Sequence, residues 1–165
     1  MGFFSRLMGG SDEQKTAASE LEILAPVSGE LVHLENTNDP AFSSRALGDG
    51  VAVVPQEGTV CAPVSGTVAA LFPTEHALGI MSDDSSAQVI DTVKLEGKGF
   101  HALVAQGDHV DVGQPLVEVD FDAVRVAGFD PTVFVIVCER SENSTLREHA
   151  SGPVAVKEPV VWLSE

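Results

Sequence analysis

A five-residue motif occurs twice in this chain, and it constrains the fold more than any other feature of the sequence. Residues 25–29 read APVSG, and residues 62–66 repeat the same five letters. Each copy follows apolar residues and precedes a largely apolar run, at 30–34 and at 67–71. Proline ends a strand and presets a turn, and serine and glycine complete that turn before the next strand begins. The matching flanks therefore predict a duplicated β-hairpin unit.

The remaining sequence is also punctuated like a β protein. Its 15 glycines and 9 prolines divide the 165 residues into short apolar runs, which favours strands and turns over long helices. We expect a short helix at 121–127, ended by Gly128 and Pro131. Further strands are expected at 50–54, 89–95, 101–104, 115–119, 132–137 and 160–163. The sequence thus predicts an all-β, mainly antiparallel fold, a β-sandwich or flattened barrel with duplicated hairpin units and one or two short helices.

The N-terminal residues differ from the rest in composition. Residues 11–20 are polar and show no strand period, so we expect a flexible tail over 1–20 and one sandwich domain over 21–165. Residues 1–8 are apolar with one basic residue and stop at two glycines, unlike a signal peptide. No apolar run is long enough to span a bilayer. We expect a cytoplasmic protein whose tail makes at most a transient membrane contact.

The charge balance restricts the partners. The chain has 25 acidic and 9 basic residues and a formal charge of −16. Such a surface repels the phosphates of nucleic acids, so we expect no nucleic-acid binding. It either attracts a protein partner with a basic or apolar face or serves only to keep the chain soluble.

Cys61 and Cys138 are far apart and outside any C-x-x-C pair, which indicates buried thiols in a reducing cytosol.

One histidine is the best candidate for chemistry. His76 follows Thr74 and Glu75 between two apolar segments, and loops or strand ends on a rigid scaffold often present functional groups. Histidine serves near neutral pH as a nucleophile or a proton carrier. The alternative is a solvent-exposed turn residue. We expect the other histidines to be solvated and without a function: His33, His101, His109 and His149.

An ordered set of segments carries a family resemblance. The segments, in chain order, are the two APVSG repeats, LGDGVA at 47–52 followed by Pro55, TEHA at 74–77, DTVKLEGKGF at 91–100 and VGQPL at 112–116. Together they resemble the glucose-type enzyme IIA component of the bacterial phosphoenolpyruvate:sugar phosphotransferase system. The resemblance covers nearly all of residues 20–163.

This resemblance implies a sandwich with a shallow apolar depression in which two histidines face each other. One accepts a phosphoryl group from the histidine phosphocarrier protein and passes it to a sugar-transporter B domain, and the other supports it. His76 matches the supporting histidine, and the Thr74 hydroxyl is expected to orient its imidazole. Regulated enzymes or permeases are further expected partners.

The chain departs from the family where the acceptor histidine belongs. The family pattern reads hydrophobic, His, hydrophobic, Gly, Ile, Asp, Thr, Val; here only Ile90, Asp91, Thr92 and Val93 match, after the segment MSDDSSAQ at 81–88. We therefore expect a shortened strand or a polar loop between Ile80 and Val89, and impaired transfer. Losing one preorganised donor costs about 3 kcal/mol of transition-state stabilisation, and losing the nucleophile costs more. The alternative function is a non-catalytic regulatory binding module.

The partner-docking face is better preserved in sequence. Phe42, Ala46 and Leu47 resemble the family segment that lines the apolar contact face, and Phe72 and Asp91 are further candidates for docking. Exposed apolar residues beside a shallow site usually bind a protein. The alternative is that Phe42 and Phe72 are ordinary core residues.

Cofactor chemistry does not fit the sequence. The chain has no H-x-H pair, no H-E-x-x-H motif and no cysteine cluster, so we expect no metal site. The turn at residues 113–115 resembles that of a lipoyl or biotin carrier, but no lysine stands at a matching hairpin tip. We expect no cofactor.

Overall fold

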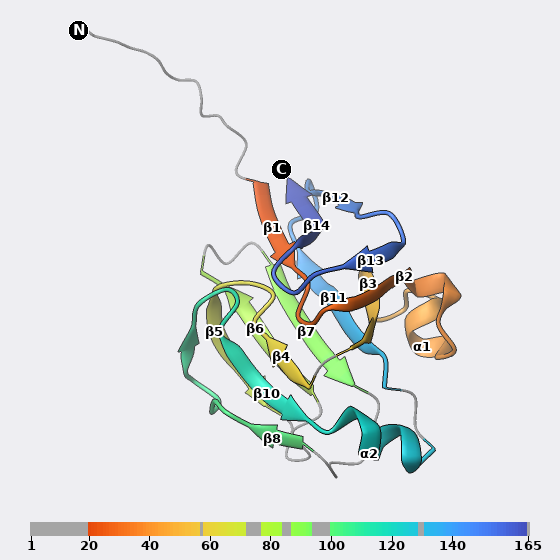
Figure 1. Cartoon of the computed structure of the whole chain (residues 1–165). Coiled ribbons are helices and arrows are strands. Elements are labelled where there is room, and N and C mark those ends of the chain that lie inside the picture. The colour runs from red at the N-terminus through yellow and green to blue at the C-terminus, as the bar shows by residue number, and fades with distance from the viewer. Residues whose placement is uncertain are drawn as a thin grey trace, which may run out of the picture.

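A large sheet and two small ones form the body of the protein (Figure 1). This computed structural model describes residues 20–56, 58–71, 77–83, 87–93, 100–128 and 131–164, without the side chains of residues 41, 91–93 and 100. The large sheet contains, in spatial order, β13 (Gly152–Val154), β2 (Gly29–His33), β3 (Asp49–Pro55), β11 (Val133–Arg140), β7 (Ala87–Val93), β6 (Ala77–Ser82), β5 (Gly66–Leu71) and β9 (His109–Val110). All of its neighbouring strands are antiparallel.

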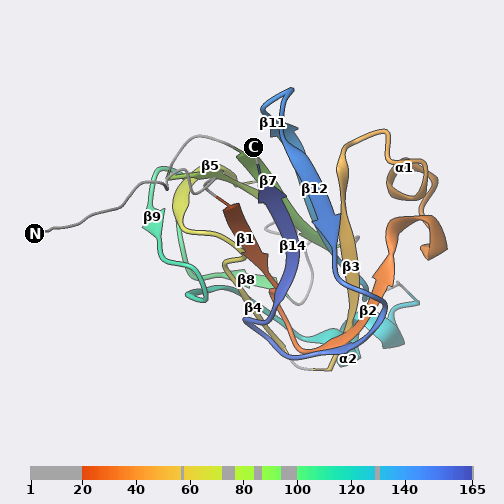
Figure 2. The ribbon, with the colours of Figure 1, turned by 90° about the horizontal axis from the view of Figure 1, so that it is seen from above.

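The two small sheets pack against one face of the large sheet. One contains β1 (Glu20–Leu24), β14 (Pro159–Ser164) and β12 (Thr145–Glu148), and the other contains β4 (Thr59–Cys61), β10 (Pro115–Val119) and β8 (Phe100–Ala102). Figure 2 shows the large sheet curving around β1 and β14. Apolar side chains from all three sheets share one core, which includes Ile23, Leu116, Val135 and Val161. The sandwich, flattened-barrel prediction is confirmed.

Strand alternation gives the large sheet a second apolar face. Val51, Val53 and Val135 are fully buried in the main core, whereas the intervening Ala52 and the neighbouring Phe134 belong to a separate cluster. Successive side chains on a strand point to opposite faces, so this second cluster lies on the outer face of the sheet. It is covered by the connection between β2 and β3, which contains a 3₁₀ turn, η2 (Leu34–Asn36), and a short helix, α1 (Pro40–Ser43).

The repeated motif forms two equivalent turns. The Ser28 hydroxyl accepts a hydrogen bond from the amide of Val156 at 2.8 Å, and the Ser65 hydroxyl accepts one from Val112 at 2.7 Å. The two turns are also joined reciprocally by backbone bonds, from Leu24 to the Pro63 carbonyl and from Cys61 to the Pro26 carbonyl, both 2.8 Å long. The predicted duplication is therefore present in the hydrogen bonding as well as in the amino-acid sequence.

The predicted elements agree with the observed ones to within a few residues. The expected strand at 115–119 is β10 with the same bounds, and the expected helix is α2 (Phe121–Val126), whose first turn is capped by the Asp120 carboxylate accepting from the Ala123 amide at 3.0 Å. Cys61 is buried as expected, but Cys138 is only half-buried. No helix in the described part of the chain is long and apolar enough to cross a membrane.

Candidate docking face and the site beside it

The outer face of the large sheet is built around an aromatic stack. Phe42 of α1 lies over Phe134 of β11, with ring centroids 4.2 Å apart and planes inclined by 16°. Leu34, Ala52 and Ile136 complete the cluster beneath them. Phe134 is buried, whereas Phe42 remains half-exposed. Phe42 thus anchors its segment on the sheet and still presents part of its ring to the surface, and its docking role stays a prediction.

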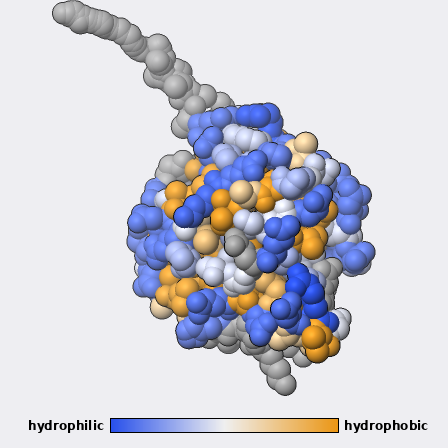
Figure 3. All heavy atoms as spheres, in the orientation of Figure 1, coloured by the Kyte–Doolittle hydropathy of each residue, from blue (hydrophilic) through white to orange (hydrophobic). Residues whose placement is uncertain are grey.

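Ala46 and Leu47 follow in the same connection, and both are exposed. Leu47 has 51% of its surface accessible, one of five large apolar side chains exposed in the described part of the chain. We call residues 42–47 the docking segment. Figure 3 shows several small apolar patches between polar residues on the face it displays, so exposure alone does not single out a docking face, and the stack beneath Phe42 is the more informative feature.

Arg45 lies at the centre of a charge network beside these residues. Its guanidinium contacts Glu148 at 2.7 Å, Glu35 at 2.8 Å and Asp49 at 3.1 Å. The pKa of Arg45 is raised, chiefly by its hydrogen bond to Glu148. Its backbone φ is 61°. This left-handed conformation costs a non-glycine residue about 1 kcal/mol or more and persists only where the surrounding structure holds it.

β6 and β7, which flank the position expected for the acceptor histidine, are neighbours in the large sheet. Ala77 pairs with Thr92, and Met81 pairs with Gln88, so the two strands are antiparallel. No residue from 77 to 93 is a histidine. The Ser82 hydroxyl accepts a hydrogen bond from the Ala87 amide at 3.1 Å, between the end of β6 and the start of β7.

Two buried apolar residues stand at the positions of the family pattern. Counted back from Asp91, the histidine of that pattern falls at Ala87 and the glycine falls at Val89. Ala87 is 2% exposed and Val89 is fully buried, both in the main core. The positions that the pattern assigns to the acceptor and its glycine therefore face the inside of the sandwich and not the outer face that carries Phe42.

The other predicted site residues are described only in part. Phe72, Thr74 and His76 lie outside the described residues, and their roles stay predictions. Asp91 is described in its backbone alone: it pairs with Val135 of β11 and with Leu78 of β6. Its docking role is likewise a prediction.

The remaining histidines lie away from β7, on β2, β8, β9 and the segment after β12. A ring nitrogen of His33 contacts the carbonyl of His149 at 3.0 Å, and His149 contacts Glu158 at 3.2 Å. The Asp83 carboxylate contacts a ring nitrogen of His109 at 3.0 Å. This hydrogen bond is the largest cause of the raised pKa of His109. Three of these four side chains thus contact other residues of the chain, which the sequence did not indicate. The fourth, His101, is exposed.

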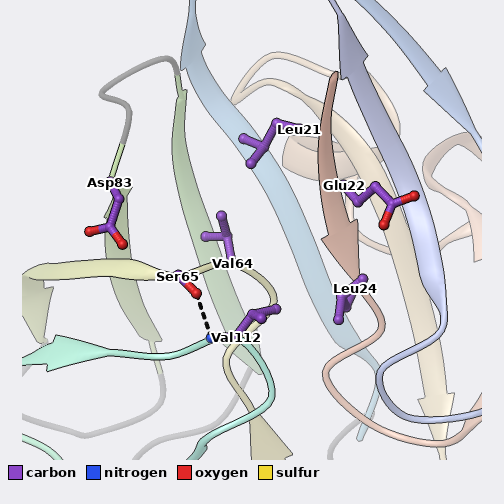
Figure 4. A pocket seen from close by; sticks show the side chains of 7 residues that line it. All are labelled: Leu21, Glu22, Leu24, Val64, Ser65, Asp83 and Val112. Atoms are coloured by element: carbon purple, nitrogen blue, oxygen red, sulfur yellow. Dashed lines mark hydrogen bonds between the residues drawn. The ribbon is translucent and has the colours of Figure 1, made fainter. Parts of the chain in front are cut away.

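A pocket of about 290 Å³ opens elsewhere, between β1 and the second APVSG turn (Figure 4). Its seven lining residues are Leu21, Glu22, Leu24, Val64, Ser65, Asp83 and Val112. None of the predicted site residues is among them. Within the described residues, no group of three or more His, Cys, Asp and Glu side chains is placed to hold a metal ion.

A family model identifies the family to which this fold belongs. Residues 21–143 match the model described as phosphoenolpyruvate-dependent sugar phosphotransferase system, EIIA 1. The chain belongs to this EIIA family. The solved glucose permease IIA of Mycoplasma capricolum superposes on this EIIA chain with a TM-score of 0.80 and 31% identity, covering 87% of this chain and 96% of that one.

Curated relatives agree with this assignment. The glucose-specific EIIA component of Staphylococcus aureus (strain COL) is 39% identical to this EIIA chain over 127 residues, which cover 74% of each. The β-glucoside-specific EIIBCA component of Bacillus subtilis is 37% identical over 169 residues, covering 99% of this chain. The chain spans 28% of that Bacillus relative and 20% of the glucose-specific EIICBA component of Streptococcus pneumoniae.

Sequence reasoning missed Arg45 and its carboxylates. The three acids are distant from one another in the sequence, on η2, β3 and β12, and nothing local indicates that they converge. The available signal was a lone basic residue among the apolar docking candidates in a chain with only 9 basic residues.

Proposed function

We propose that this chain is an EIIA-type module of the sugar phosphotransferase system that keeps the docking face of its family and is impaired in phosphoryl transfer. Its expected partners are the histidine phosphocarrier protein and a sugar-transporter B domain, both on the cytoplasmic side. Family membership supports this proposal, as do relatives named EIIBCA and EIICBA components. The docking segment, with Phe42 stacked on Phe134, supports the docking half of it.

The observation that supports the impairment is that residues 77–93, over which β6 and β7 pair, contain no histidine. Transfer between histidines requires a neutral imidazole nitrogen in line with the phosphorus and hydrogen-bond donors for the phosphoryl oxygens. Here the pattern positions of the acceptor and its glycine are occupied by Ala87 and Val89 in the main core. His76 alone would have to attack the phosphorus without the second imidazole that supports the family's acceptor.

The second candidate is a regulatory binding module, which docks on the same partners without carrying a phosphoryl group. It is favoured by the fact that the docking segment is anchored on both sides, by the stack on Phe134 and by the ion pairs of Arg45. A chain that lacks the acceptor has no catalytic reason to retain this anchoring.

Phosphorylation and docking, measured together, test the proposal. The chain is incubated with labelled phosphoenolpyruvate, enzyme I and the phosphocarrier, and acid-labile label is counted; docking of the phosphocarrier is measured by calorimetry. The Staphylococcus aureus EIIA serves as the positive control, and a His76→Asn variant reports label on His76. We expect docking with at most trace label. Stoichiometric label would overturn the impairment, and absence of docking would overturn the proposal as a whole.

A further inference from the structure

Three carboxylates from three separate elements converge on one arginine next to the docking segment. Glu35 comes from η2, Asp49 from β3 and Glu148 from β12, and the Arg45 guanidinium reaches all three within 3.1 Å. Glu148 is contacted through both of its oxygens, at 2.7 and 3.3 Å. Only 17% of its side chain is exposed, so this contact is screened least by solvent. Networks of this kind hold a segment better than isolated surface pairs do.

The docking segment is fixed at its two ends by packing. At one end, Phe42 stacks on Phe134. At the other end, Gly48 approaches β11 so closely that a Cβ there would lie 2.3 Å from the Val137 carbonyl oxygen. Between these ends the chain turns twice, with the Arg45 amide donating to Phe42 at 2.9 Å and the Gly48 amide donating to Arg45 at 3.2 Å. Arg45 is thus the middle of the segment.

We propose that Arg45 is the positioning residue of the docking face, since its ion pairs to Glu148 and Glu35 hold Ala46 and Leu47 in the conformation that the partner binds. This inference rests on the proposed docking function. A preorganised apolar contact loses less conformational entropy on binding than a mobile one does. Without the guanidinium, the three carboxylates would repel one another, although Asp49 would keep its contact with Arg140 at 3.2 Å.

Geometry as well as charge is required at this position. The planar guanidinium donates to Glu148 and Glu35 in different directions at once, which a lysine ammonium on a flexible stem does less well. An Arg45→Lys variant is therefore expected to recover only part of the docking that Arg45→Met loses. A purely electrostatic role, in which Arg45 acts through long-range charge alone, would give full recovery.

Two matched variants test the positioning role. Arg45→Met removes the guanidinium and keeps an unbranched stem. Arg147→Met makes the same change in net charge at a site where the arginine pairs with Glu20 at 3.0 Å and covers Trp162 instead. Because several ion pairs are lost at once, we expect Arg45→Met to weaken docking of the phosphocarrier about tenfold and Arg147→Met to change it less than about twofold. In a double-mutant cycle, Glu148→Gln and Arg45→Met should be clearly non-additive.

Hydrogen exchange in the free chain separates this inference from the proposed function. The amides of residues 45 and 48 are expected to exchange about tenfold faster in Arg45→Met than in the wild type, while those of β11 keep their protection. Unchanged exchange and docking in Arg45→Met would overturn the positioning role and leave the proposed function standing. Wild-type chain that does not dock at all would overturn the proposed function, and the exchange rates would still decide whether Arg45 holds the segment.

Discussion

Phe42 and Phe134 are 92 positions apart in this EIIA chain, yet their rings lie 4.2 Å apart and nearly parallel. This contact joins the connection between β2 and β3 to the centre of the large sheet. It places one aromatic side chain at the boundary between the buried cluster and the surface. The proposed docking face is therefore supported by the sheet beneath it, and changes to this stack should affect stability and docking together.

Removing the Phe42 ring should expose that coupling. Phe42→Ala deletes the stack and uncovers Phe134, so we expect a loss of about 2 kcal/mol in the free energy of unfolding, below the usual cost for a fully buried ring because Phe42 is half-exposed. Docking of the phosphocarrier should fall in parallel. Urea unfolding and calorimetry measure the two effects. Leu47→Ala, which removes an exposed side chain, should weaken docking with little change in stability; equal destabilisation by both variants would contradict this account.

A histidine placed at the pattern position of the acceptor should fail to restore transfer. Ala87→His would put an imidazole into the main core, where Ala87 is 2% exposed, and we expect a loss of about 3 kcal/mol from overpacking and from burying a polar ring. Gln88→His, at the next and half-exposed position of β7, is the matched control and should cost less than about 1 kcal/mol. Thermal unfolding and phosphate labelling check both variants, and a stable, labelled Ala87→His chain would refute the placement of that position in the core.

The glycine of the repeated motif should be irreplaceable. A Cβ at Gly66 would lie 2.0 Å from the Met81 carbonyl oxygen, and one at Gly29 would lie 1.9 Å from that of Val54. Because backbone atoms cannot move aside cheaply, we expect Gly66→Ala and Gly29→Ala each to cost about 3 kcal/mol or more. Gly79→Ala, whose Cβ would come closest to the flexible end of Gln88 at 3.3 Å, should be tolerated. Urea midpoints that rank Gly79→Ala with the other two would count against the duplicated turn.

The contact between His109 and Asp83 should make a small, pH-dependent contribution to stability. The pKa of His109 is raised by Asp83, so its stabilising effect is complete below the ordinary histidine pKa of about 6.5 and is lost as the pH rises through the folded value. NMR titration should give a raised pKa for His109 that falls back in Asp83→Asn. A His109 pKa unaffected by Asp83→Asn would show that the contact does not form in solution.

The repeat and the short-range elements were predictable from the sequence, whereas the docking face is proposed only by resemblance. The turn residues of both APVSG copies and the alternating side chains of β10 determine structure locally, so both can be recognised in the amino-acid sequence. Arg45, which has a left-handed backbone conformation, pairs with Glu148, which is 103 positions away. The inward placement of Ala87 and Val89 depends on the pairing of β7 with β11. Such long-range contacts leave no local pattern to read.

We propose that this EIIA-type chain lacks a phosphoryl acceptor while its fold remains intact. The decisive test is intact-mass spectrometry after incubation with phosphoenolpyruvate, enzyme I and the histidine phosphocarrier protein, under mildly alkaline conditions that preserve phosphohistidine. We expect the unmodified mass for nearly all of the chain, beside a fully phosphorylated Staphylococcus aureus EIIA in the same mixture. A shift of nearly all of the chain by one phosphoryl group would show that an acceptor is present.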